Sequence, residues 1–118
     1  MAWKDIKKED DLKSVAEMFE GGAKLVSVSY VAAGENSDVN DVREAIFTFR
    51  GEKTFKLKFS EVDCMHVAPI SMGSIYINDI AIGKFGNLFF WADDGYFNIT
   101  EPDTSLTYAI AKGISLEK

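Results

Sequence analysis

The spacing of apolar residues constrains this chain most, because after Lys24 it follows a period of two. The segment Phe55–Ser60 (FKLKFS) alternates apolar and polar side chains, and just before it Ala45, Phe47 and Phe49 alternate with Glu44, Thr48 and Arg50. An extended strand directs successive side chains to opposite faces, so each segment would bury one face and expose the other. The short polar connection Arg50–Lys53 joins the two segments. Together they predict an antiparallel β-hairpin.

Similar patterns predict strands along most of the chain. Val26, Val28 and Tyr30 alternate with serines, which is typical of a half-buried strand. Asp94-Gly95 is a favoured turn pair, and it predicts a hairpin between the apolar run at 88–91 and residues 96–99. Strands are expected at residues 26–30, 45–50, 55–59, 62–67, 74–82, 88–91, 96–99 and 106–111.

The period differs before Gly21. Apolar residues there recur at intervals of three and four, which predicts a helix over about residues 9–20. Gly21 and Gly22 would end it, since glycine adopts the left-handed conformation without steric cost. The apolar stripe of this helix consists of Leu12, Val15, Ala16 and Phe19.

These elements predict one domain over residues 1–118 of the α+β class. It would be a mainly antiparallel β-sheet of seven or eight strands (about 24–116) behind one N-terminal helix. The sheet would form a curved layer or a small sandwich. Short connections between successive strands favour antiparallel pairing over parallel pairing.

The charge balance narrows the classes of partner. The chain has 19 acidic and 13 basic residues and a net charge of -6. This disfavours binding to nucleic acid or to an anionic membrane surface, and it suits a basic protein partner. The single cysteine, Cys64, suits a reducing compartment. No apolar segment has the length of a membrane helix or the form of a signal peptide, so a soluble, cytoplasmic protein is expected.

The pair Cys64 and His66 is the strongest candidate for chemistry. Residues two apart on a strand share a face but stand roughly 7 Å apart, whereas a nucleophile and its base need about 3 Å. One histidine cannot build a His-rich metal site, and no phosphate-binding glycine motif is present. We therefore predict no enzymatic activity, no catalytic residue, no metal ligand and no cofactor. The sequence leaves open another role for these two residues, and whether Leu88–Trp91 is core or ligand surface.

Acidic residues gather instead in two polar, turn-rich segments. Carboxylates at loop tips accelerate association with a basic partner, and an aromatic neighbour can anchor it. The predicted partner-binding residues are Glu35, Asp38, Asp41, Asp93, Asp94 and Tyr96.

Three segments carry a resemblance to a known family: Phe55–Phe59, Ile77–Ile82 and Gly86–Trp91. In these the chain resembles bacterial polymorphic-toxin immunity proteins of the immunity protein 50-like group, over roughly residues 24–99. The resemblance implies a cytoplasmic, non-enzymatic protein that neutralises a cognate toxin by binding it tightly.

Two other functions fit the same pattern. A small-molecule or lipid binding β-domain would need an apolar cavity inside the curved sheet. A structural or assembly subunit would form a defined homo-oligomer.

Overall fold

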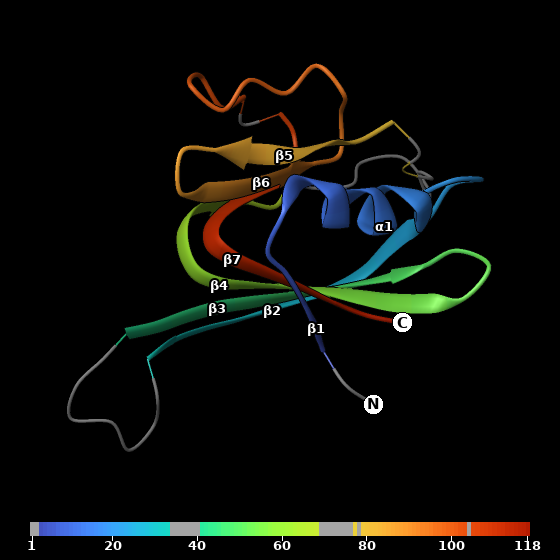
Figure 1. The fold of residues 1–118 in the computed structure, drawn as a ribbon, viewed down its shortest axis with the longest axis horizontal. Helices are drawn as coiled ribbons and strands as arrows, with labels where there is room; N and C mark the ends of the chain where they lie inside the picture. The colour runs from blue at the N-terminus through green and yellow to red at the C-terminus, as the bar shows by residue number, and fades with distance from the viewer. Residues whose placement is uncertain (1–2, 34–40, 69–76, 78, 104) are drawn as a thin grey trace.

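The computed structural model describes residues 3–33, 41–68, 77, 79–103 and 105–118. It forms a seven-stranded antiparallel sheet with one short N-terminal helix, which confirms the predicted fold class (Figure 1). Within the described part of the chain, no helix has the length and apolar content to cross a membrane. The strands are β1 (Lys4–Ile6), β2 (Lys24–Ala33), β3 (Asp41–Arg50), β4 (Thr54–His66), β5 (Ala81–Phe85), β6 (Leu88–Ala92) and β7 (Tyr108–Glu117).

The sheet has the strand order β2-β3-β4-β7-β6-β5, and β1 pairs with β7. On one side β7 pairs with β4 along most of its length, and on the other it pairs first with β6 and then with β1. The two ends of the strand order meet at Ala23 and Ile77, whose backbone N–H groups donate to each other's carbonyl oxygens at 2.9 and 2.6 Å. This isolated bridge lies outside the named strands and links the segments that precede β2 and β5.

The sheet curves where β3, β4 and β7 each depart from regular strand geometry, at positions that lie next to one another across the sheet. In β4 the side-to-side alternation breaks at Glu61, because Phe59 and Val62 both lie in the core. Glu61 has φ 52° and Arg43 of β3 has φ 43°, and the Arg43 guanidinium donates to the Val62 carbonyl at 3.1 Å. In β7 both ends of Ala111–Ile114 face the core, so the alternation breaks there too. We call this row of irregular residues the bend line; such bulges bend a sheet and increase its twist.

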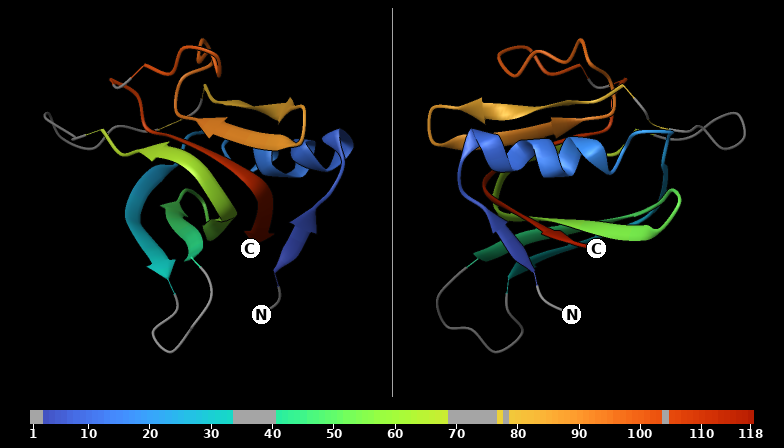
Figure 2. Two further views of the ribbon diagram at one scale, coloured as in Figure 1. Left: turned by 90° about the vertical axis from the view of Figure 1, so that its left-hand side faces the viewer. Right: turned by 45° about the vertical axis from the view of Figure 1, so that its right-hand side comes forward.

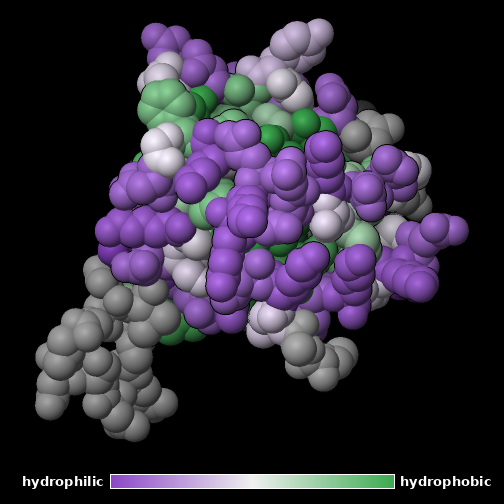
Figure 3. All heavy atoms as spheres, viewed as in Figure 1, coloured by the Kyte–Doolittle hydropathy of each residue, from purple (hydrophilic) through white to green (hydrophobic). Residues whose placement is uncertain are grey.

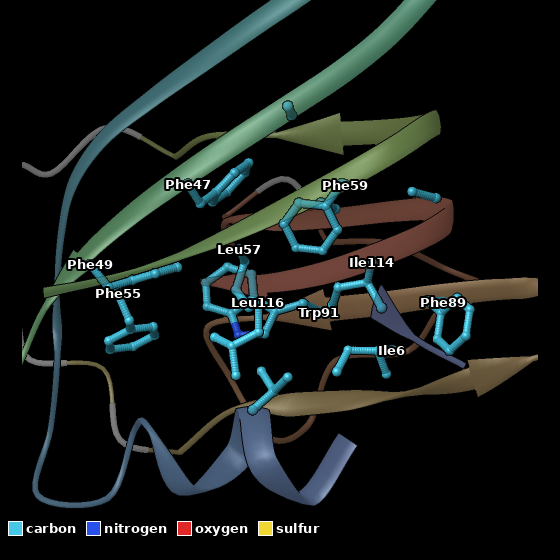
Figure 4. Packing of buried hydrophobic residues seen from close by; sticks show 14 of the residues in the cluster. Ile6, Phe47, Phe49, Phe55, Leu57, Phe59, Phe89, Trp91, Ile114 and Leu116 are labelled. Atoms are coloured by element: carbon cyan, nitrogen blue, oxygen red, sulfur yellow. The ribbon is translucent and has the colours of Figure 1, made fainter. Parts of the chain in front are cut away.

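The concave face of the sheet holds the main core (Figure 4). Trp91 of β6 lies against Phe47 and Phe49 of β3, with ring centroids 5.8 and 5.3 Å apart. Phe19 contacts Phe49 edge-to-face at 4.9 Å, which attaches the segment after the helix to the same cluster. Because Trp91 and Phe89 are buried here, half of the Leu88–Trp91 run is core. Large rings from distant strands thus fill the interior of the curve.

The helix begins with a 3₁₀ turn, η1 (Glu9–Asp11), and continues as α1 (Leu12–Glu17). The α-helix ends at Glu17, three residues before the predicted end, and turns follow up to Gly21. Gly21 and Gly22 have φ values of 82° and 91°, the left-handed conformation expected of them. Figure 2 shows α1 lying between the β5–β6 hairpin and the lower strands β2, β3 and β4. Leu12, Val15 and Phe19 are buried in the core, as the apolar stripe predicted, whereas Ala16 is only half-buried.

The β3–β4 hairpin is confirmed, with Phe47 opposite Leu57 and Phe49 opposite Phe55. Other boundaries differ from the prediction. The expected strand at 62–67 is the end of the single 13-residue strand β4, and the last strand runs through Tyr108–Glu117 rather than 106–111. Of the expected strand at 74–82, residues 74–76 and 78 lie outside the described residues, and among the others only Ala81 and Ile82 belong to a strand, β5. The short strand β1 had no predicted counterpart.

The predicted burial of β2 is wrong at two positions. Val26 is 57% exposed and Tyr30 is 47% exposed, while Val28 packs against the core. The pairing with β3 shifts between Leu25 and Ser27, which interrupts the alternation. In the strand order β2 is also terminal, so fewer neighbours cover its side chains.

Candidate functional site

The loop from Asp93 to Thr107 connects β6 to β7, and we call it the 93–107 loop. The Asp93 N–H donates to the Thr107 carbonyl at 3.0 Å, and the Thr107 N–H donates to Asp93 Oδ1 at 3.2 Å. These bonds extend the β6–β7 ladder by one step beyond the Ala92–Tyr108 pair. The two ends of the loop are therefore joined by hydrogen bonds between Asp93 and Thr107, and we call this pair the neck of the loop.

The expected strand at 96–99 is wrong, and so is the hairpin at Asp94-Gly95. Described residues between the neck positions form turns instead of a strand. The reason lies in the sheet, because β5 and β7 already pair with the two sides of β6. No edge of β6 remains to which a returning strand could hydrogen-bond.

The loop contains three turns that are stabilised by hydrogen bonds from backbone N–H groups to a side chain. The Asp94 carboxylate accepts from the Tyr96 N–H at 2.8 Å, and the Asp94 carbonyl accepts from the Phe97 N–H at 3.1 Å. Asn98 repeats the pattern with the N–H groups of Thr100 and Glu101, at 3.0 and 3.1 Å. Such Asx turns hold the backbone in one conformation without help from a sheet.

The third turn begins at Asp103. Its carboxylate accepts from the Ser105 N–H at 2.8 Å, and its carbonyl accepts from the Leu106 N–H at 3.0 Å. Hydrogen bonds from the Ser105 backbone and side chain lower the pKa of Asp103, which keeps this exposed carboxylate ionised to lower pH.

Phe97 attaches the loop to the convex face of the sheet. Its ring lies 5.2 Å from the ring of Tyr108 in β7 and 5.9 Å from that of Phe90 in β6. These rings belong to a second apolar cluster, which we call the outer cluster. Its members are Cys64, Ala81, Leu88, Phe90, Ala92, Phe97, Ile99, Tyr108 and Ile110.

Tyr96 lies next to Phe97 but has the opposite environment. It is 93% exposed, the highest exposure among the large apolar and aromatic side chains that the structure describes. The 93–107 loop also has four acidic residues and no basic residue: Asp93, Asp94, Glu101 and Asp103. The loop therefore presents an uncovered aromatic ring within a strongly anionic segment.

The six predicted binding residues are only partly placed by the structure, and those that it places lie on one loop. Asp93, Asp94 and Tyr96 lie together on the 93–107 loop. Asp93 is half-buried at the neck, and burial raises its pKa, with further increase from the nearby charge of Asp94 and an opposing hydrogen bond from Thr107. Glu35 and Asp38 lie outside the described residues, as does the side chain of Asp41, the first residue of β3.

The prediction omitted two acidic residues of the same loop, Glu101 and Asp103, which are exposed. Glu101 ends the turn that begins at Asn98, and Asp103 begins the next turn. Their residue type and the absence of basic neighbours could have identified them from the sequence.

Cys64 and His66 have separate partners beneath the loop. The Cys64 thiol lies 3.7 Å from the Tyr108 hydroxyl, and His66 Nδ1 lies 3.1 Å from the Leu106 carbonyl oxygen. A carbonyl only accepts, so Nδ1 is the donor in that bond. The His66 ring also stacks on Tyr108 at 6.1 Å. Burial, and then the hydrogen bond and charge of Cys64, raise the pKa of Tyr108 and keep its phenol neutral.

Cys64 and His66 therefore make structural contacts, because Cys64 connects β4 to Tyr108 of β7 and His66 connects β4 to Leu106 just before β7. Among the described residues, no group of three or more His, Cys, Asp or Glu side chains is arranged to hold a metal ion. Comparisons with protein-family models, curated proteins and solved structures find no match to this chain.

Proposed function

We propose that this protein is a non-enzymatic binding domain that takes a basic protein partner on the 93–107 loop. Its most specific form would be an immunity protein that neutralises a cognate bacterial toxin in the cytoplasm. The observation that carries the proposal is Tyr96, almost fully exposed beside Asp94 on a loop whose turns are internally braced.

Pre-organisation supports this use of the loop. A flexible loop loses conformational entropy when it binds, whereas one held by three Asx turns has lost most of it during folding. Tyrosine is frequent among residues that dominate binding energy, since its ring is large and rigid and its hydroxyl stays polar. The carboxylates of Asp94, Glu101 and Asp103 would attract a cationic surface and orient it.

The alternative of a ligand inside the curved sheet has less support. The concave side is filled by Phe47, Phe49 and Trp91, which are fully buried and in mutual ring contact. A ligand there would have to displace these rings.

Self-association has a specific observation in its favour, because terminal strand β2 exposes Val26, Tyr30 and Val31 and carries no charge between Leu25 and Ala33.

The test compares two variants in affinity capture from the native host, with quantitative mass spectrometry. The loop variant combines Tyr96→Ala with Asp94→Asn, Glu101→Gln and Asp103→Asn. The control removes three exposed carboxylates elsewhere, through Asp10→Asn, Glu17→Gln and Glu52→Gln. We expect a basic protein to be retained by the wild type and the control, and to be lost at least tenfold from the loop variant.

Purified components then test the mechanism. Association with that partner should slow as salt rises, because screening weakens long-range attraction. Co-expression of the chain should restore growth of cells that express the partner, if the partner is a toxin. Retention of the same proteins by both variants would refute the proposed surface.

A further inference from the structure

A gap in strand pairing lies beside β7, far along the strand from the 93–107 loop. On one side of β7, pairing with β6 ends at Ala111 and pairing with β1 begins at Ile114. Among the described residues, no strand pairs with Lys112 and Gly113 on that side. These two residues also lie on the bend line, where Gly113 is opposite Ser60 of β4.

A hollow of about 440 Å³ lies at this gap, between β1, the turn of the β5–β6 hairpin and β7. Its apolar lining consists of Ile6, Phe89 and Ile114, which are buried members of the main core. Figure 4 shows these three side chains next to one another at one end of the core. The hollow thus brings core side chains within reach of a small molecule from solvent, and its size is within the range of known ligand sites.

The polar lining is cationic, in contrast to the acidic chain as a whole. Three exposed lysines line the hollow, namely Lys7, Lys84 and Lys112. Lys84 Nζ lies 5.4 Å from the centre of the Phe89 ring, so one ammonium is held directly above the apolar lining. The one carboxylate of the hollow, Asp5, accepts a hydrogen bond from the Ser115 hydroxyl at 2.8 Å. Figure 3 shows hydrophilic side chains covering the face that carries α1 and β1, with apolar atoms between them.

We propose that this hollow binds a small organic anion, a carboxylate carried on an aromatic or aliphatic group. The carboxylate would lie among the three ammonium groups, and the apolar group would contact Ile6, Phe89 and Ile114. Neither half of the hollow suffices alone, because exposed lysines bind anions weakly in water and an open apolar surface discriminates little. The site is separate from the 93–107 loop, so each can fail independently of the other.

The test is a titration of the ¹⁵N-labelled protein with benzoate, followed by NMR. Saturable shifts are expected for the amides of Lys84, Asn87 and Gly113. Benzyl alcohol, which has the same ring without the charge, should bind about tenfold more weakly, and so should inorganic phosphate, which lacks the ring. Equal binding of benzyl alcohol would overturn the role of the lysines, and shifts confined to other regions would overturn the site.

Two sets of variants separate a specific site from general attraction. Lys7→Gln, Lys84→Gln and Lys112→Gln together should weaken benzoate binding at least about tenfold. The control Lys8→Gln, Lys24→Gln and Lys53→Gln changes three exposed lysines outside the hollow and has the same net charge. It should bind within about twofold of the wild type. Equal weakening in both would overturn the proposal.

Gly113→Val tests the space without changing the charge. A Cβ at this position would lie 3.4 Å from Ser60 Cβ, which is an ordinary contact, and the NMR spectrum of the variant checks that the fold also accommodates the two methyl groups. The valine methyl groups would occupy the hollow and weaken benzoate binding. Unchanged affinity in this variant, with the fold intact by its spectrum, would also count against the site.

Discussion

The two faces of the sheet are packed in different ways. On the concave face, fully buried rings from the helix end, β3, β4 and β6 form one continuous core. On the convex face, the outer cluster has three buried residues, Ala92, Tyr108 and Ile110, surrounded by half-buried ones. The concave core joins elements to one another, whereas the outer cluster attaches one loop to a sheet that is already formed. The difference indicates that stability depends on the first face, whereas the second face holds the 93–107 loop in place.

The largest expected effect is at the centre of the concave core. Trp91→Ala removes ring contacts with Phe19, Phe47 and Phe49 and should lower the free energy of unfolding by about 4 kcal/mol. Trp91→Phe should cost less, because Nε1 is buried with no hydrogen-bond partner among the described residues. Urea unfolding measures both.

The matched control is Phe85→Ala, which truncates an exposed ring in β5. It should change the free energy of unfolding by no more than about 0.5 kcal/mol. A similar loss in Phe85→Ala and Trp91→Ala would mean that the concave core does not dominate stability.

An intermediate effect is expected in the outer cluster. Phe97→Ala removes contacts with Phe90 and Tyr108, and it should lower the free energy of unfolding by about 2 kcal/mol, since this ring is only partly buried. In NMR spectra the amides of Tyr96 and Thr100 should move toward disordered values, while those of β3 stay in place. Intact turns in this variant would show that the Asx hydrogen bonds alone hold the loop.

The smallest effect concerns Asp93 at the neck. Burial raises its pKa above the usual 3.8, so the folded state holds the proton more tightly than the unfolded chain does. Its contribution to stability is therefore fully present below pH 3.8 and is lost as the pH rises through the raised folded-state pKa. Relative to Asp93→Asn, the wild type should lose less than about 0.5 kcal/mol between about pH 4 and pH 7, because water screens the half-buried group.

Urea unfolding of both proteins at the two pH values measures this difference. Glu17→Gln, which removes an exposed carboxylate from α1, serves as the comparison. A wild type that gains stability with pH relative to Asp93→Asn would contradict the direction of the pKa change.

Much of the fold was predictable because it depends on local periodicity. Phe47 and Phe49 alternate with polar neighbours, as do Leu57 and Phe59, and the two strands form the predicted antiparallel hairpin. The glycines after Phe19 adopt the expected left-handed conformation, although the helix itself ends earlier, at Glu17. Prediction failed where neighbouring strands decide the outcome, as with Tyr30, whose exposure depends on β2 being terminal.

The candidate site was predictable in its residue types and in part of its geometry. Asp94 and Tyr96 were chosen for charge and turn position, and both lie on the 93–107 loop, where Tyr96 is exposed and Asp94 is half-buried. The role of Asp93 was not predictable, because its hydrogen bond with Thr107 joins residues fourteen positions apart. The strand expected after Gly95 was wrong for a related reason, since β5 and β7 had taken both sides of β6.

The sequence by itself determined the antiparallel β class, the N-terminal helix with its buried apolar stripe and the acidic character of the loops. These properties depend on the residue types and their spacing within a few positions. Only the tertiary structure decided which strands adjoin, where the sheet bends at Glu61, and that Lys7, Lys84 and Lys112 meet around one hollow. Those outcomes depend on long-range pairing through β7, which no local pattern encodes.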